Sequence, residues 1–296
     1  MTGLLPDTLY HFRIVTAPAD TPVHTVRTAP SRTVATGTSA GFSFVAYGDS
    51  RSHPERHGAV IQSILAAARP LFVVHTGDLV AAGEDSARWH QEFLLPGAAL
   101  FRSTPILAVL GNHDLDGRSR PQDLSPWWRR VLVFPGQQEA AGYGRWFSLD
   151  IGGIHLVCLD STAPDADGQT EWLSADLASP AAQQADFIVA VYHHPSYTAG
   201  NHRSDMHTRA KWTPLFDRYG MDLVLNGHNH FYQRTFPIRY GIPQKPAATE
   251  GDPGSGSVYR AGEGTVYCVT GGGGAPLYEP DTAHFVATGA RRYHFL

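Results

Sequence analysis

Continuous apolar runs, rather than alternating apolar and polar positions, recur along the chain from residue 42 onward. Candidate strands lie at Phe42–Tyr47, Leu71–His75, Ile106–Leu110, Phe187–Tyr192 and Leu223–Leu225. Between them, helical spacing predicts helices near Ala59–Ala68, Ser86–Leu95, Gln169–Leu177 and His207–Tyr219. Strands that are apolar on both faces are typical of a sheet covered by helices, so the pattern predicts an α/β fold.

Three further segments add detail to this fold. Trp146–Asp160 reads as a hairpin that turns at the Gly152-Gly153 pair. Gly241–Gly264 is rich in Pro, Gly and Ser, which predicts a long surface loop. Tyr293–Leu296 has the pattern of a strand that is just beginning.

Residues 1–40 follow a different pattern. Leu9–Val15 alternates apolar and polar side chains, and Val23–Thr28 is a second short strand candidate that ends before Pro30. Small residues over 33–41 predict a linker. The expected organisation is therefore a β segment at 1–32, a linker at 33–41 and one α/β domain at 42–296.

Composition narrows the possible partners. The formal net charge is −4, so nothing points to nucleic acid as an obligatory partner. No run approaches the roughly 20 apolar residues that a membrane helix needs, so no membrane partner is expected. Cys158 and Cys268 each lie in an apolar β-rich run, and we expect two buried free thiols rather than a disulfide.

Polar side chains follow each apolar strand at the point where it ends. The motifs are Gly48-Asp49-Ser50-Arg51, Gly77-Asp78, Gly111-Asn112-His113-Asp114, His193-His194-Pro195 and Gly227-His228-Asn229-His230. Ligands of α/β sheets bind at this edge, and glycine lets the backbone turn tightly and approach a ligand closely. Alone, each motif could be a turn, a cap or a half-buried pair; together, in this order, they indicate one site.

The residue types at these strand ends suit two divalent or trivalent metal ions, because carboxylate, amide and imidazole ligands favour metals of intermediate hardness. A dinuclear centre needs a carboxylate that bridges the ions and a water placed between them. The candidate ligands are Asp49, Asp78, Asn112, His193, His228 and His230.

This series of motifs resembles the calcineurin-like metallophosphoesterase superfamily over about residues 42–275. Gly227–Arg234 is most similar to the purple acid phosphatase branch, which typically has G-H-x-H-x-Y-E-R at this place. Leu5–Tyr10 and Arg27–Pro30 resemble the last two strands of a fibronectin type III-like domain. The resemblance implies a four-layer α/β/β/α sandwich, preceded by a short β remnant of such a domain.

The resemblance also implies roles for individual residues. It implies that Asp78 bridges two metals, that one metal is bound by Asp49 and His230, and that the other is bound by Asn112, His193 and His228. His113 would face the substrate and stabilise or protonate the leaving oxygen, and Asp114 would orient His113. His202 would be a second substrate-facing histidine. Arg51 is expected either to contact phosphate or to pair with a neighbouring acid. His194 would lie behind the ligands, and Arg234 would pack the last motif.

The sequence departs from the family pattern at the first metal. Purple acid phosphatases have a tyrosine ligand three residues after the bridging aspartate, where this chain has Ala81. The alternative histidine, two residues after the first aspartate, is replaced by Arg51. A water, His53 or His57 could fill the gap. We therefore expect a protein that is not purple and that uses Zn, Mn or ferrous iron.

The predicted function is hydrolysis of phosphomonoesters, in the manner of an acid phosphatase, by attack of a metal-bound hydroxide without a phosphoenzyme. The alternatives are a phosphodiesterase or nuclease of the same superfamily, or a non-catalytic binding module that keeps the fold. The expected partner is a small phosphate ester, and the oligomeric state is left open. Unpaired strands at both ends predict that the chain is a fragment of a longer protein, which favours an extracellular or periplasmic location.

Overall fold

The computed structural model describes residues 3–15, 20–31, 41–117, 123–134, 142–245, 259 and 262–296. The predicted linker at 33–41 lies outside these ranges except for its last residue, and so does most of the predicted loop after residue 245. Within the described part, the predicted α/β character is confirmed by two sheets and the helices that pack on them.

The smaller sheet is parallel and has the order β3-β4-β5. Its strands are β3 (Val45–Tyr47), β4 (Val73–His75) and β5 (Ile106–Ala108). All three lie within predicted strands but are shorter: β3 and β4 begin later than predicted, and β5 ends two residues earlier.

The larger sheet has the order β14-β10-β13-β9-β8-β7-β6. Its central strands β7, β8, β9 and β13 are parallel, whereas β6, β10 and β14 join antiparallel. The bounds are β6 Phe147–Ile151, β7 Ile154–Cys158, β8 Phe187–Val191, β9 Leu223–Asn226, β10 Tyr232–Thr235, β13 Val266–Thr270 and β14 Val286–Ala290. The β6–β7 hairpin confirms the one predicted over Trp146–Asp160.

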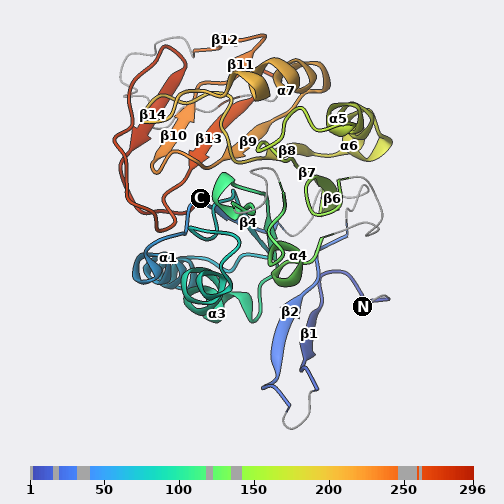
Figure 1. The fold of residues 1–296 in the computed structure, drawn as a ribbon. Helices are drawn as coiled ribbons and strands as arrows, with labels where there is room; N and C mark the ends of the chain where they lie inside the picture. The colour runs from blue at the N-terminus through green and yellow to red at the C-terminus, as the bar shows by residue number, and fades with distance from the viewer. Residues whose placement is uncertain are drawn as a thin grey trace.

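The helices gather on the two outer sides of the molecule (Figure 1). On the side of the smaller sheet lie α1 (Pro54–Ala67), α2 (Ser86–Arg88), a π-helical turn (Trp89–Leu94) and α3 (Leu95–Phe101). On the side of the larger sheet lie α5 (Gln169–Leu177), α6 (Pro180–Gln184) and α7 (Met206–Tyr219). A short helix, α4 (Trp128–Val131), contributes the buried Trp128 to the core.

Three clusters of buried side chains hold these elements together. One contains Val74 of β4 and Val189 of β8, so the two sheets face each other across it. A second joins Val224 of β9 to Trp212 of α7. A third joins Val73 of β4 to side chains of α1. Strands of both sheets are thus buried on both faces, as their continuous apolar runs predict.

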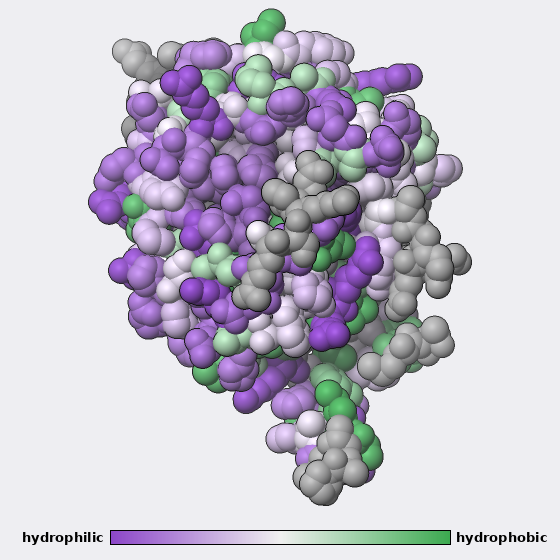
Figure 2. Space-filling view, in the orientation of Figure 1, coloured by the Kyte–Doolittle hydropathy of each residue, from purple (hydrophilic) through white to green (hydrophobic). Residues whose placement is uncertain are grey.

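The two ends of the chain behave differently. β1 (Leu9–Phe12) pairs antiparallel with β2 (His24–Arg27), and this hairpin projects from the body with exposed apolar side chains (Figures 1 and 2). At the other end, the backbone N–H and C=O of Leu296 both bond to Ala46 of β3 at 2.9 Å. The predicted terminal strand therefore lies beside β3, although no regular strand forms there.

Two short strands, β11 (Ile238–Arg239) and β12 (Ile242–Pro243), form a separate small hairpin. The two cysteines, Cys158 and Cys268, are buried and free, as predicted. Burial raises the pKa of the Cys268 thiol to about 12, which makes it unreactive at neutral pH.

Candidate metal centre

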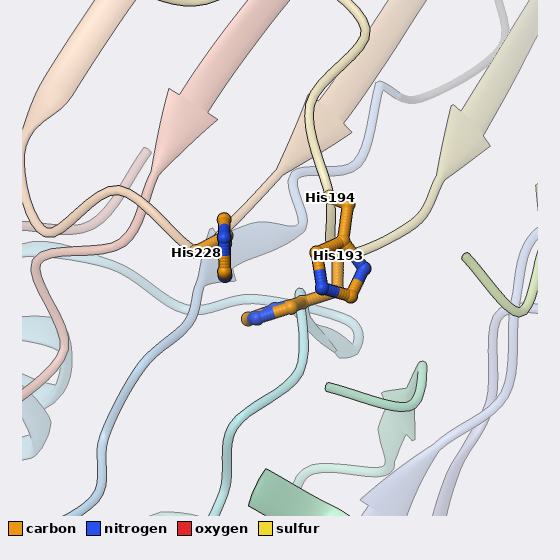
Figure 3. A group of neighbouring side chains, drawn as sticks. All are labelled: His193, His194 and His228. Atoms are coloured by element: carbon orange, nitrogen blue, oxygen red, sulfur yellow. The ribbon is translucent and has the colours of Figure 1, made fainter. Parts of the chain in front are cut away.

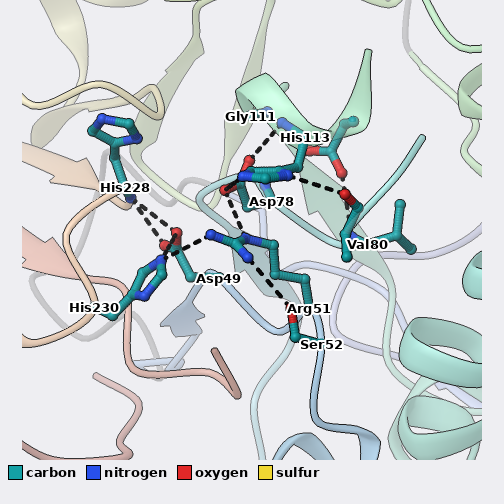
Figure 4. A network of polar contacts seen from close by, with 12 residues as sticks. Asp49, Arg51, Ser52, Asp78, Val80, Gly111, His113, His228 and His230 are labelled. Carbon is teal, nitrogen blue, oxygen red and sulfur yellow. Dashed lines mark hydrogen bonds and ion pairs between the residues drawn. The ribbon is translucent and has the colours of Figure 1, made fainter. Parts of the chain in front are cut away.

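The polar motifs that follow the strands have an unusual backbone. Asp49, Asp78 and His228 have φ angles of 56°, 57° and 70°, in the left-handed region that residues with a Cβ rarely adopt. Such strain is commonly kept where it positions a functional side chain. Figure 4 shows the three turns beside one another, with the carboxylate of Asp49 accepting from the backbone N–H of His228 at 3.0 Å.

Glycines make this close approach possible. A Cβ at Gly111 would lie 2.2 Å from Asp78 Oδ1, and one at Gly227 would lie 2.5 Å from Asp49 Oδ2. Both distances are far inside normal contact, so any larger residue would displace a carboxylate. The predicted use of glycine before the polar groups is therefore confirmed at these two positions.

Two carboxylates and an imidazole form the buried centre of the cluster. Ligand atoms of Asp49, Asp78 and His193 all lie within 4.8 Å of one another. Asp78 Oδ1 is 3.4 Å from His193 Nε2, and Asp49 Oδ1 is 3.3 Å from His230 Nε2. Asp49, Asp78 and Asn112 come from the smaller sheet, whereas the histidines come from the larger one.

Backbone carbonyls fix the tautomers of two of these imidazoles. The Nδ1–H of His193 donates to the carbonyl of Thr76 at 2.9 Å, and that of His230 donates to the carbonyl of Pro276 at 2.7 Å. Each Nε2 therefore presents its lone pair toward a carboxylate. His193 Nε2 is buried without a hydrogen-bond partner in the described structure. A lone pair and a carboxylate that face each other in this way suit a cation between them.

A second group contains three histidines, His193, His194 and His228 (Figure 3). Burial lowers the pKa of His228 far below its ordinary value, and the neighbouring His193 and His194 lower it further. Burial likewise lowers the pKa of His194 to about 4. His194 and His228 are therefore neutral at physiological pH, which is the form that binds metal.

His194 was expected behind the ligands, and the structure brings one of its ring nitrogens into the same group as those of His193 and His228. Its Nδ1 lies 3.0 Å from the hydroxyl of Ser161. The sequence signal for this closeness is the His193-His194 doublet itself. Asn112 is exposed and begins the 3₁₀ turn Asn112–Asp114, directly after Gly111.

Asp78 stays ionised despite its burial. Burial alone would raise its pKa, but His193, His113 and Arg51 and a backbone hydrogen bond from His113 outweigh that effect and hold the pKa below its usual range. Asp114 behaves in the opposite way. Burial, followed by the charge of Asp78, raises the pKa of Asp114 well above its usual value. The two carboxyl groups thus differ in their environments.

The predicted role of Asp114 needs correction. Its carboxyl group accepts from the backbone N–H groups of Asp78, Leu79 and Gly111 at 2.8–2.9 Å, so it braces the two turns. The group that orients His113 is the carbonyl of Ala81, which lies 3.0 Å from His113 Nδ1. Asp114 adjoins His113 in sequence, but the 3₁₀ turn directs its side chain inward, to the backbone amides that it accepts from.

Arg51 pairs with an acid in this structure. Its Nε donates to Asp78 Oδ2 at 3.2 Å, and its Nη2 lies 3.5 Å from His230 Nε2 (Figure 4). Nη1 donates to the hydroxyl of Ser52 at 3.3 Å. Of the two expectations for Arg51, the ion pair is the one present here.

His202 lies at the cluster, as expected. Its ring centroid is 4.1 Å from that of His228, and its backbone is fixed by two hydrogen bonds with the side chain of Asn229. By contrast, His57 uses both nitrogens on the hydroxyl of Tyr47 and the carbonyl of Glu92, and His53 faces Glu55. Neither therefore fills the gap at the first metal.

Tyr278 is a neighbour of the cluster that sequence reasoning missed. Its ring stacks on His230 with centroids 4.2 Å apart, and its backbone N–H donates to the His230 carbonyl. The Gly-rich stretch that follows β13 carries the chain back to the site, but no motif in that stretch indicates this contact. Arg234, expected to pack the last motif, lies with its guanidinium over the ring of Tyr259.

Comparison with known proteins places this geometry among relatives. The calcineurin-like phosphoesterase family model matches residues 42–232. An uncharacterized protein of Mycobacterium tuberculosis is 26% identical over 306 residues, which cover 93% of this chain and 57% of that protein. Purple acid phosphatase 15 of Arabidopsis thaliana is 31% identical over 141 residues, which cover 46% of this chain and 26% of the enzyme.

Solved structures share the fold. The purple acid phosphatase PPD1 from yellow lupin seeds matches with a TM-score of 0.78 and 19% identity, over 99% of this chain and 55% of that chain. GAP50 of Plasmodium matches with a TM-score of 0.58 and 15% identity, over 85% and 78%. This chain thus spans little more than half the length of the mycobacterial relative and of the lupin enzyme. Among the described residues, no helix has both the length and the apolar character needed to cross a membrane.

Proposed function

Because this chain belongs to the calcineurin-like phosphoesterase family, we propose that it is a dinuclear metal-dependent phosphoesterase that hydrolyses phosphomonoesters. Asp49 and His230 would hold one cation and Asp78 would contact both. The second cation would be held by Asn112, His193 and His228. Zn, Mn or ferrous iron suit this mixture of oxygen and nitrogen ligands.

One observation carries this proposal. His193 Nε2 presents a lone pair to Asp78 Oδ1 at 3.4 Å, in a buried position where it has no hydrogen-bond partner among the described residues. Asp78 Oδ1 accepts the backbone N–H of His113, but leaving the buried Nε2 of His193 without a partner is costly, at roughly 1–3 kcal/mol. A cation removes that cost, and so the arrangement is better explained by metal binding than by fold stability.

Two such cations would lower the pKa of a bound water and hold the attacking and leaving oxygens of an in-line displacement. The protein supplies the remaining groups. His113 keeps its Nδ1–H on the Ala81 carbonyl, so its Nε2, 4.0 Å from Asp78 Oδ2, is the atom that can hold or release a proton. When protonated there, His113 can donate to the leaving oxygen of an ester.

His202 and Arg51 complete the proposed substrate site. Burial lowers the pKa of His202, so at neutral pH it is a neutral ring that can contact a substrate without adding charge. Arg51 is half-buried beside the cluster and carries a planar set of donors that matches two phosphate oxygens. Ser50 and Ser161 each contact a histidine near the cluster, but both serines are buried; Ser50 donates to the Leu79 carbonyl, and Ser161 accepts from the backbone N–H of His194. These bonds support direct hydrolysis rather than attack by a serine.

The proposal extends to the fold and the setting of the enzyme. The three core clusters, with helices outside two facing sheets, support a four-layer sandwich. The β1–β2 hairpin supports the fibronectin type III-like origin of residues 1–32 only by its pairing. We also propose a small phosphate ester as the partner and an extracellular or periplasmic location.

The test is activity with controlled metal. Protein reloaded with Zn²⁺ or Mn²⁺ should hydrolyse a chromogenic phosphomonoester faster than a chromogenic diester, and should leave DNA intact. Chelation should abolish this activity and metal should restore it. Preference for the diester or for DNA would move the function to the phosphodiesterase or nuclease alternative. Metal binding without hydrolysis of any substrate would support a non-catalytic module.

A further inference from the structure

Arg51 occupies an unusual place for a permanent positive charge. Its guanidinium lies between Asp78 Oδ2, 3.2 Å from Nε, and His230 Nε2, 3.5 Å from Nη2. These are two of the three side chains that the proposed function assigns to the first metal. The side chain is 15% exposed, so water screens this charge only in part.

The two oxygens of Asp78 face different partners. Oδ1 accepts the backbone N–H of His113 at 3.0 Å and faces the unpaired Nε2 of His193. Oδ2 already has a cation beside it, the guanidinium of Arg51. The Asp78 oxygen that faces His193 therefore has no positive charge beside it, whereas the oxygen that faces Arg51 does.

The two ring nitrogens of His230 also face different partners. Its Nδ1–H is committed to the Pro276 carbonyl, so Nε2 carries a lone pair toward Asp49 and Arg51. A guanidinium N–H can satisfy that lone pair only where a metal ion would otherwise do so. An arginine cannot lose its charge in a protein, so it can give way only by moving.

Resting on the function proposed above, we propose that Arg51 is a resident cation at the first metal position. The chain then binds one divalent ion tightly beside Asp78 and His193, and admits a second ion only when the guanidinium moves away. A phosphate group is the partner that can draw it away, because it offers Arg51 two anionic oxygens. Phosphate and the second ion therefore promote each other's binding, as linkage requires.

Equilibrium titration with Mn²⁺ tests this, with bound metal counted per chain. The wild-type chain should bind a first ion tightly and a second one roughly 10- to 100-fold more weakly, because a divalent ion is repelled by a nearby unit charge. Inorganic phosphate should reduce this difference in affinity between the two ions. Without phosphate, Arg51→Gln should reduce the difference in affinity between the first and second Mn²⁺ ions by about 10-fold or more. Adding phosphate to this variant should then reduce the difference little further.

Arg56→Gln is the matched control, because Arg56 is an exposed cation on α1 that pairs with Glu55. This variant should keep the wild-type difference in affinity between the two Mn²⁺ ions. Arg51→Met, which removes the charge without adding a hard metal ligand, gives a second reading should Arg51→Gln not fold. Electron paramagnetic resonance gives a readout independent of activity, since neighbouring Mn²⁺ ions couple magnetically and a single ion does not.

Two equal sites in the wild-type chain would overturn the proposal, and so would Arg51 variants that fold and keep the wild-type difference in affinity. Failure of the proposed function looks different: neither the wild-type chain nor any variant would bind Mn²⁺ at the cluster, with or without phosphate. The titration therefore separates an error about Arg51 from an error about the metal centre.

Discussion

Backbone carbonyls hold the imidazoles around the candidate centre. Thr76, Pro276 and Ala81 each accept from the Nδ1 of a histidine, leaving Nε2 of that ring directed at the cluster. Because a carbonyl can only accept, each bond fixes which nitrogen carries the proton. His193 and His230 present their Nε2 atoms to carboxylates, whereas His113 stands further off, 4.0 Å from Asp78 Oδ2.

Because His113 lies further from the carboxylates than His193 and His230 do, His113→Ala should affect catalysis and not metal binding. The variant should keep the metal content of the wild-type chain, because the ring is not one of the clustered ligands. Its turnover should fall by about 10²–10⁴-fold, the usual effect of losing an acid–base group. Elemental analysis and steady-state kinetics on a phosphomonoester measure both. His284→Ala, at an exposed position, is the control and should change neither. Loss of metal from His113→Ala would show that its role is misassigned.

The sequence predicts which residues gather here better than it predicts what each one touches. A glycine and a polar residue after an apolar strand locate Asp49, Asp78 and His228, since the ends of parallel strands share one edge. The direction of Asp114 was not predictable, because the amides that it braces come from turns after two different strands. The contact of Tyr278 with His230 was likewise not predictable, because the two residues are some 48 positions apart in the sequence.

At the scale of elements, helix ends with clear caps were predicted well. α7 begins after Asp205, whose carboxylate accepts from the N–H of Thr208, and ends at Gly220 with φ 74°. The segment predicted as one helix over Ser86–Leu95 instead passes through α2, a π-helical turn and α3. It continues past Pro96 because proline fits the first turn of a new helical segment.

Another element contact gives a prediction about pH. His155 of β7 bonds to Asp150 of β6 at 2.8 Å and to Asp176 of α5 at 3.0 Å. Burial alone would lower its pKa, but the two carboxylates more than offset that effect and raise it above its ordinary value of 6.5. A raised pKa in the folded state stabilises the protein fully below the unfolded value, and this stabilisation disappears as the pH rises through the folded value.

His155→Gln should therefore cost more free energy of unfolding at pH 6 than at pH 8, by about 1 kcal/mol. Denaturant unfolding of wild type and variant at both pH values gives this difference, and groups common to both proteins cancel. Asp222→Asn, a carboxyl group at another strand end, serves as the control for a change that does not touch His155. An equal cost at the two pH values would mean that folding does not raise the pKa of His155.

For the whole molecule, the site lies where the two sheets meet. The N–H of Gly48, after β3, donates to Thr270 at the end of β13, and the N–H of Ala275 donates to the Asp49 carbonyl. Neither sheet carries a complete set of candidate ligands, since the carboxylates come from one and the imidazoles from the other. Sequence order alone could not show how the two sheets join, but it did place every candidate ligand at a strand end.

The most direct test of the centre is anomalous diffraction from crystals of this chain grown with Zn²⁺. We predict a strong peak between Asp78 Oδ1 and His193 Nε2, at about 2.0–2.2 Å from each atom once they coordinate the ion. A peak bounded only by His193, His194 and His228, without Asp78, would contradict the assigned ligands. Zinc bound elsewhere, with no peak at the strand-end cluster, would contradict the metal centre itself.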